Sequence, residues 1–200
     1  NQNKLLSYHD MLPAVNNLIN NCSIKIIKHK RSSLSKIMIL TGGTTGKFKV
    51  AAHKPSVFNF LNPFLVLIER LSLFKYHTAY IATPVYHGYG VAFLLLFIAM
   101  GKKTILTRRF DADRACSMIQ EYRVEVATVV PLMIYKMLKI NQEALKSLAC
   151  IISGGAELNP KLVDEVLKKL GDVLYNLYGT SEAGLNIIAA PGDLRYSAGT

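Results

Sequence analysis

The sequence predicts an α/β fold, in which a mostly parallel β-sheet carries helices on both faces. Two observations lead to this prediction. From Lys36 onward, strand-like and helix-like segments alternate along the chain. The strand-like segments are continuous apolar runs, which are typical of parallel strands buried on both faces. We therefore expect an N-terminal segment of uncertain structure over residues 1–35 and an α/β domain over residues 36–200.

Each expected strand is an apolar run that ends in a glycine, proline or polar loop. The first strand, residues 36–41, leads into the glycine-rich stretch LTGGTTGKFKV, and the next strand follows at residues 49–53. The later strands are expected at residues 78–86, 103–107, 125–130, 148–153 and 173–179.

The helices between these strands are indicated by the residues at their ends. Asp111 is a candidate N-cap, and Asn159 followed by Pro160 is a preferred pair at a helix start. Gly101 closes an apolar helix, whereas Pro63 predicts a kink or break in the first long helix. The helices are expected at residues 54–73, 90–102, 111–123, 132–140 and 159–170, with a weaker candidate near residues 10–20.

The charge balance points to anionic partners. The net charge is +11, from 24 Lys and Arg against 13 Asp and Glu, and residues 25–36 form the densest basic run. Such an excess favours phosphates, nucleic acid or an acidic membrane face. The alternative is that this basic surface is balanced by acidic residues elsewhere in a longer protein. The chain begins at Asn1 and not at a methionine, so we expect it to be a fragment.

The cysteines and the apolar runs indicate a cytoplasmic protein without a membrane span. Cys22, Cys116 and Cys150 show neither the spacing of a metal site nor that of a disulfide framework, which fits reduced thiols. The strongest apolar run, residues 91–100, is about half the length that a membrane-spanning helix needs.

Glycine-bearing or polar loops follow four of the expected strands. In a parallel sheet the carboxyl ends of the strands share one edge, and ligands bind there. We therefore expect these loops to form one site. They are Thr41–Lys47, His87–Gly90, Gly154–Glu157 and Thr180–Glu182.

The first of these loops has the composition of a phosphate-binding loop. Its glycines let backbone N–H groups converge on an anion, and its threonines and lysines add donors and charge. It is not a Walker A loop, because three residues separate Gly42 from Gly46 and Phe48 follows Lys47. A plain hairpin turn is the alternative reading of the same residues.

Four motifs together resemble the adenylate-forming superfamily. The stretch LTGGTTGKFK resembles its phosphate loop, YGTSE its Tyr-Gly-x-Thr-Glu motif, SGGAEL its adenine-contacting segment, and PVYHGYG the aromatic-His-x-x-Gly segment beside its acyl pocket. The order and spacing also match, from about Lys36 to Thr200. Gly42, Phe48 and Val50 depart from the family's Ser, Pro and Gly, and Ser181 stands for its Thr.

The resemblance implies roles for the residues that match these motifs. Lys49 stabilises the leaving pyrophosphate, Ser181 contacts the α-phosphate, and Glu182 holds Mg²⁺, which prefers carboxylate oxygen. His87 lies near the substrate carboxylate, and the catalytic residues implied are thus His87, Lys49 and Glu182. The phosphate loop comprises Thr41, Gly42, Gly43, Thr44, Thr45, Gly46, Lys47 and Lys49.

For the adenine, the resemblance implies that Tyr178 lies against the ring and that Asn176 lines the same pocket. The remaining nucleotide-binding residues are Gly154, Gly155, Ala156, Glu157, Gly179 and Thr180.

The activity that the resemblance implies is ATP-dependent activation of a carboxylic acid to an acyl-adenylate, followed by transfer to a thiol, most simply coenzyme A. ATP, Mg²⁺ and the acid are the expected small-molecule partners, and the family's C-terminal lid domain lies beyond Thr200. We expect the chain to supply the ATP-binding half and not to turn over by itself. The alternatives are an amino-acid adenylation domain and a degenerate, non-catalytic nucleotide-binding protein. A nucleic-acid binder that uses residues 25–36 lacks a supporting motif.

Overall fold

The computed structural model describes residues 37–42, 48–53, 57–180 and 184–196, with side-chain detail from residue 64 onward. Strand β1 (Ile37–Gly42) pairs antiparallel with β2 (Phe48–His53) in a two-stranded sheet of its own. The expectation that β1 belongs to the parallel sheet is therefore wrong. Only five residues separate the two strands in the sequence. A connection this short favours antiparallel pairing between neighbouring strands, whereas a parallel pair needs a longer crossover.

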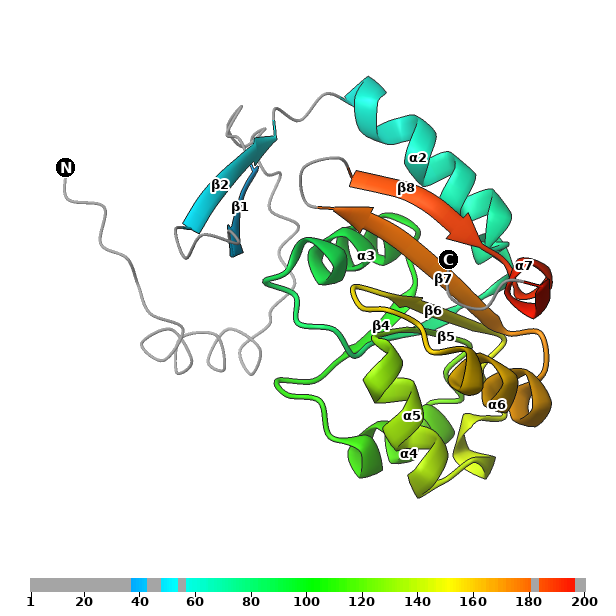
Figure 1. The fold of residues 1–200 in the computed structure, drawn as a ribbon. Coiled ribbons are helices and arrows are strands. Elements are labelled where there is room, and N and C mark those ends of the chain that lie inside the picture. The colour runs from blue at the N-terminus through cyan, green and yellow to red at the C-terminus, as the bar shows by residue number, and fades with distance from the viewer. Residues whose placement is uncertain (1–36, 43–47, 54–56, 181–183, 197–200) are drawn as a thin grey trace, which may run out of the picture. The chain divides into compact units, whose positions relative to one another are not determined.

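The main sheet has six strands in the order β4-β3-β5-β6-β7-β8 (Figure 1). The first five strands run parallel, and β8 is antiparallel to β7, which confirms the predicted mostly parallel sheet. The strands are β3 Thr78–Ile81, β4 Lys103–Leu106, β5 Val126–Val129, β6 Cys150–Gly154, β7 Leu174–Thr180 and β8 Gly184–Ala189.

Helices cover both faces of this sheet, as the sequence predicts. Figure 1 shows α2 and α3 on one side and α4, α5 and α6 on the other. The helices are α2 Val57–Arg70, α3 Gly88–Ala99, α4 Ala112–Glu121, α5 Pro131–Ile140, α6 Pro160–Leu170 and α7 Pro191–Tyr196, with short 3-10 turns η1 Leu73–Lys75 and η2 Glu143–Leu145.

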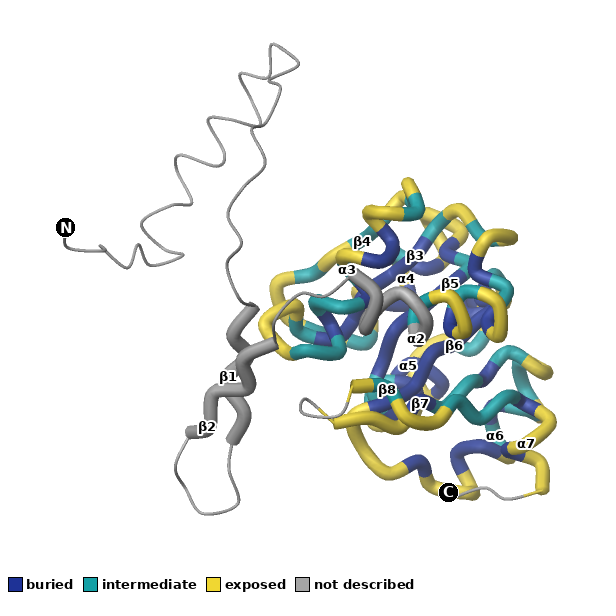
Figure 2. The backbone as a smooth tube through the Cα atoms, turned by 90° about the horizontal axis from the view of Figure 1, so that it is seen from above, coloured by how far each residue is buried: buried dark blue, intermediate teal, exposed yellow. Residues whose placement is uncertain are grey.

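The central strands are buried along their whole length, which is why they read as unbroken apolar runs. Figure 2 shows β5 and β6 dark blue throughout. Along β5, Ala127 and Val129 pack in the core under α4, α5 and α6, whereas Val126 packs in the core under α2 and α3. Alternate residues of one strand therefore anchor two separate helix layers.

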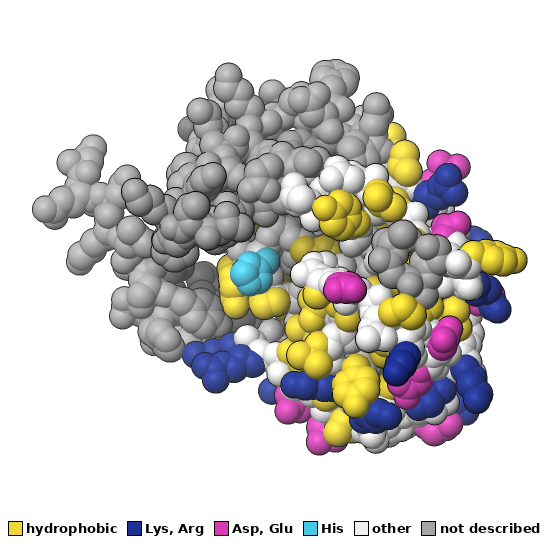
Figure 3. Space-filling view, in the orientation of Figure 1, with side chains coloured by type: hydrophobic (Ala, Val, Ile, Leu, Met, Phe, Trp, Pro, Cys, Tyr) yellow, Lys and Arg dark blue, Asp and Glu magenta, His cyan; other side chains and the backbone are white. Residues whose placement is uncertain are grey.

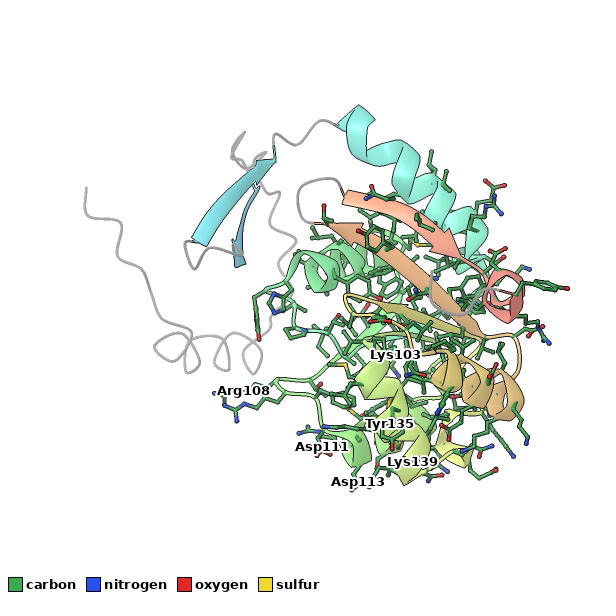
Figure 4. The ribbon with its side chains drawn as sticks, viewed as in Figure 1. Lys103, Arg108, Asp111, Asp113, Tyr135 and Lys139 are labelled. Carbon is green, nitrogen blue, oxygen red and sulfur yellow. The ribbon has the colours of Figure 1, made fainter. Side chains whose placement is uncertain are left out.

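The helix starts follow the predicted caps. Asp111 Oδ1 accepts a hydrogen bond from the Arg114 backbone N–H at 2.9 Å at the start of α4 (Figure 4). Asn159 Oδ1 accepts from the Lys161 N–H at 2.9 Å, with Pro160 as the first residue of α6. Of the kink or break predicted at Pro63, the break is absent, since α2 continues through this residue to Arg70. Leu67, in the last turn and a half of this helix, packs in the core, with Phe64 and Ile68 against it.

Side-chain hydrogen bonds connect the amino ends of β3, β4 and β5. The Glu125 carboxylate accepts hydrogen bonds from the backbone N–H groups of His77 at 2.6 Å and Thr78 at 3.0 Å. Lys102 Nζ donates to the Leu73 carbonyl at 2.6 Å and to the Tyr76 carbonyl. Desolvation raises the pKa of Glu125, but these N–H donors and the nearby charges of His77 and Lys102 outweigh it, so the pKa lies below its ordinary value.

The outer surface carries both signs of charge. Figure 3 shows Lys and Arg side chains mixed with Asp and Glu over the lower part of the molecule, where Figure 1 places α4, α5 and α6. Lys169 pairs with Glu165 at 2.7 Å, and Lys139 lies 3.7 Å from the same carboxylate. Within the described part of the chain, no helix has both the length and the apolarity to cross a bilayer.

We predict that Glu125→Gln lowers the free energy of unfolding at pH 7 by about 1 kcal/mol, because a neutral amide accepts the two N–H bonds more weakly. Since the folded pKa of Glu125 is depressed, its contribution is present above the unfolded value of about 4.3 and is lost as pH falls through the folded pKa. Thermal melts between pH 7 and pH 3 measure the stability difference between the unmodified protein and Glu125→Gln. The exposed Glu69→Gln variant serves as control. A stability difference that persists unchanged at pH 3 contradicts it.

Candidate functional site

The parallel strands bring several predicted residues to one edge. Because β3 to β7 run in the same direction, the loops that follow them lie at their common carboxyl edge. The loop after β6 begins at Gly155, and β7 ends at Thr180 beside it in the sheet. The pairing of Gly154 with Leu177 fixes the two segments side by side.

A hollow of about 420 Å³ lies between these two segments. Apart from Leu158 and Leu177, every residue that lines it is one that the sequence assigns to the nucleotide site. The lining residues are Gly155, Ala156, Glu157 and Leu158 after β6, and Asn176, Leu177, Tyr178 and Gly179 on β7.

Asn176, one of the residues that line the hollow, carries an unsatisfied acceptor. Asn176 pairs in register with Ser153 on the neighbouring strand. Both Asn176 Oδ1 and Ser153 Oγ are buried without a hydrogen-bond partner among the described residues. Leaving a buried polar atom unpaired costs about 1–3 kcal/mol. Because Asn176 lines the hollow, its amide would reach a donor on a bound ligand once the side chain turns toward the hollow.

The walls of the hollow are an aromatic ring and a bare backbone. Tyr178 shares a face of β7 with Asn176 and is 57% exposed, so its ring is open to a flat partner. Gly155 has a φ of +76°, a conformation that favours glycine, and leaves the backbone uncovered. Glu157 is an exposed carboxylate at the same hollow.

His87 lies at the same edge of the sheet but apart from the hollow. It is the N-cap residue of α3, follows β3, and makes no side-chain cap hydrogen bond. Its ring centroid lies 4.5 Å from that of Tyr86, which is 78% exposed. In the sheet order, β5 separates this loop from β6 and β7. Arg108, after β4, extends outward at the far end of this edge (Figure 4).

Several predicted residues lie outside the described ones. These are the loop residues Gly43 to Lys47, the α-phosphate contact Ser181 and the expected metal ligand Glu182. Thr41, Gly42 and Lys49 are described as backbone in β1 and β2, where Thr41 pairs with Lys49. The described residues contain no cluster of three or more His, Cys, Asp or Glu side chains suited to a metal ion.

Sequence reasoning missed three residues at this edge. Leu158 and Leu177 are apolar residues beside polar motifs, and their burial on either side of the hollow depends on the β6–β7 register. Ser153 reads as the end of an apolar strand. Ser153 also begins the quoted stretch SGGAEL, where the resemblance implies no role for it.

The comparisons with known proteins show which family the chain matches. A family model described as AMP-binding enzyme matches residues 24–200. The chain is 27% identical over 199 residues to the probable 4-coumarate–CoA ligase 1 of Dictyostelium discoideum, covering 94% of this chain and 36% of that protein. It is 30% identical over 158 residues to the medium/long-chain-fatty-acid–CoA ligase FadD8 of Mycobacterium tuberculosis, covering 76% and 27%. The chain thus spans about a third of the length of these relatives.

Among solved structures, o-succinylbenzoate coenzyme A synthetase from Bacillus subtilis in complex with ATP and magnesium ion matches with a TM-score of 0.71 at 23% identity, covering 81% of this chain and 34% of that one. At this identity the match shows the fold, and it agrees with the mostly parallel α/β sheet described above.

We predict that Gly179→Ala disrupts the wall of the hollow. A Cβ at Gly179 would lie 2.4 Å from the Gly184 carbonyl oxygen, which belongs to the backbone of β8 and cannot rotate away. The two strands must separate, and we expect a loss of about 2 kcal/mol in the free energy of unfolding. Urea titration measures this against Gly192→Ala, where a Cβ meets nothing within 4 Å. Equal stabilities of the two variants contradict the predicted clash.

Proposed function

Because the chain belongs to the AMP-binding enzyme family of adenylate-forming proteins, we propose that the hollow between β6 and β7 binds the adenine of ATP. The observation that carries this proposal is that Asn176, whose amide oxygen has no partner among the described residues, lines the hollow together with Tyr178. The exocyclic amine of adenine is a donor that suits this acceptor. The exposed ring of Tyr178 offers a stacking surface, and Gly155 and Ala156 admit the flat base close to the backbone.

We propose that the whole protein, meaning this chain with any sequence that flanks it, is an AMP-forming acid–thiol ligase. The names of the relatives pair a carboxylic acid with CoA, which supports coenzyme A as the thiol. In the first step a carboxylate oxygen of the acid attacks the α-phosphorus of ATP and pyrophosphate leaves. In the second, the thiol sulfur attacks the acyl carbon, loses its proton, and AMP leaves.

The residues of this chain bind and orient the reactants in this scheme. The glycines and threonines of Thr41 to Gly46 offer backbone and hydroxyl donors to the β- and γ-phosphates, and Lys47 and Lys49 offset their charge. Ser181 donates to the α-phosphate, and His87 orients the carboxylate from the N-cap of α3. Mg²⁺, held by Glu182, supplies positive charge that offsets the repulsion between the two anions.

For the domain organisation, we propose that residues 36–200 form the nucleotide-binding part and that a C-terminal lid domain completes the catalytic site. Residues 1–35 precede this part as a separate segment. We place the protein in the cytoplasm, where ATP and CoA are available and where the buried thiols of Cys116 and Cys150 stay reduced.

A second candidate function is nucleotide binding without catalysis. Gly42, Phe48 and Val50 favour it, because they replace residues that the family pattern has in its phosphate loop. The two candidates differ in acid-dependent exchange of pyrophosphate into ATP by the whole protein, which the ligase carries out and a degenerate binder does not.

We predict that Asn176→Ala and Tyr178→Ala each weaken ATP binding by about tenfold, the loss expected for one hydrogen bond or one stacking contact of about 1.4 kcal/mol. Isothermal titration of the chain with ATP measures this. Asn186→Ala, on β8 outside the hollow, serves as control and keeps the original affinity. ATP binding that is unchanged in both site variants contradicts the proposed adenine site.

A further inference from the structure

Ser153, near the carboxyl end of β6, carries a buried hydroxyl that the proposed reaction does not use. Its side chain is 0% exposed, and its Oγ has no hydrogen-bond partner among the described residues. It shares a face of β6 with Ile151, which packs in the core under α4, α5 and α6. A hydroxyl buried beside such a core is costly unless a neighbouring group pairs with it.

The register of the sheet makes Asn176 the polar neighbour of this hydroxyl. A row of paired residues crosses the sheet from Val129 on β5, through Ser153 and Asn176, to Ala189 on β8. The strands of such a row lie about 5 Å apart, and its side chains share one face. Val129 and Ala189 are apolar and pack in or against the core, so Ser153 and Asn176 are the two polar members of the row.

These two side chains lie at different depths. Ser153 is fully buried, whereas Asn176 is partly exposed and lines the hollow. The Asn176 amide therefore has an inner end toward the core and an outer end toward the hollow. Its Oδ1 is buried in this structure. A half-turn of the amide about its last side-chain bond exchanges the two ends, which brings Oδ1 to the hollow and Nδ2 to the inside.

A serine hydroxyl can pair with the inner end of this amide in both orientations, because it both donates and accepts hydrogen bonds. With Nδ2 inside, Ser153 Oγ accepts from it, and Oδ1 at the hollow can accept from the exocyclic amine of adenine. An apolar side chain at position 153 could hold neither end, so the inner end of the Asn176 amide would stay unpaired. The contact needs only a change of rotamer at Ser153 or Asn176, since the two residues pair in register.

We propose that Ser153 is a positioning residue for the nucleotide: its hydroxyl accepts a hydrogen bond from Asn176 Nδ2 and so fixes the amide with Oδ1 toward the adenine. This inference rests on the proposed adenine site. It goes further because Ser153 does not border the hollow, so the affinity for ATP depends on a contact inside the sheet.

The test measures ATP affinity by isothermal titration of the whole protein and its variants. Ser153→Ala is expected to weaken ATP binding by about fivefold, because the Asn176 amide loses the group that holds its inner end. Ser153→Cys fills nearly the same space but forms only weak hydrogen bonds, so we expect a similar loss. Thermal melts verify that each variant is folded.

Thr128→Val is the matched control and keeps the original ATP affinity. The Thr128 side chain is also 0% exposed, and its Oγ1 is likewise unpaired among the described residues. It lies on the opposite face of the sheet from Ser153, because Ser153 pairs with Val129, the next residue along β5.

A double-mutant cycle shows whether Ser153 acts through Asn176. In the Asn176→Ala background, Ser153→Ala should change ATP affinity by less than about twofold, because the amide that Ser153 positions is gone. A fivefold loss that persists in this background overturns the inference. Full ATP affinity in Ser153→Cys also overturns it, since packing alone then explains the effect of Ser153→Ala.

Two further results separate this inference from the adenine site itself. Unchanged ATP affinity in Ser153→Ala, together with a loss in Asn176→Ala, overturns the inference and leaves the adenine site standing. Unchanged ATP affinity in both Asn176→Ala and Tyr178→Ala overturns the adenine site and this inference together.

Discussion

The site depends on the in-register parallel pairing of β6 with β7. This pairing sets Ser153 beside Asn176 and Gly154 beside Leu177, so the two segments that leave the strands lie on either side of one hollow. A one-residue slip would turn the side chain of Asn176 to the opposite face of the sheet. The register is fixed by the cores on both faces, where Ile151 and Leu174 pack on one side and Ile152 and Leu177 on the other.

Strand β6 has a different environment on each of its two faces. On its α6 side, β6 ends at an open hollow, with a glycine of positive φ and an unpaired amide oxygen on the neighbouring strand. On its α3 side, the strand ends against the ring of Tyr89. Gly154 and Gly155 are therefore small for different reasons, since one accommodates an aromatic side chain and the other exposes backbone to a ligand.

The mostly parallel sheet could be predicted from the sequence, because strands buried on both faces are continuous apolar runs. The strand around Val126 to Val129 and the caps at Asp111 and Asn159 follow from local chemistry alone. The separate pairing of β1 with β2 could not be predicted in this way, since an apolar run does not specify its partner strand. The hydrogen bond from Tyr89 to Ile152 could not be predicted either, because it depends on where α3 lies on the sheet.

The residues expected to contact adenine belong to two short motifs, one after β6 and one on β7. The structure brings most of these residues together at the hollow. Amide hydrogen exchange of the chain with and without ATP and Mg²⁺ tests their joint role most directly. Bound nucleotide should slow exchange in residues 154–158 and in residues 176–180 together, because both segments border the same base. The amino ends of the strands, around Glu125, should exchange as before. Protection that spares either segment, or that appears at the amino edge instead, would contradict a single nucleotide site at the carboxyl ends of β6 and β7.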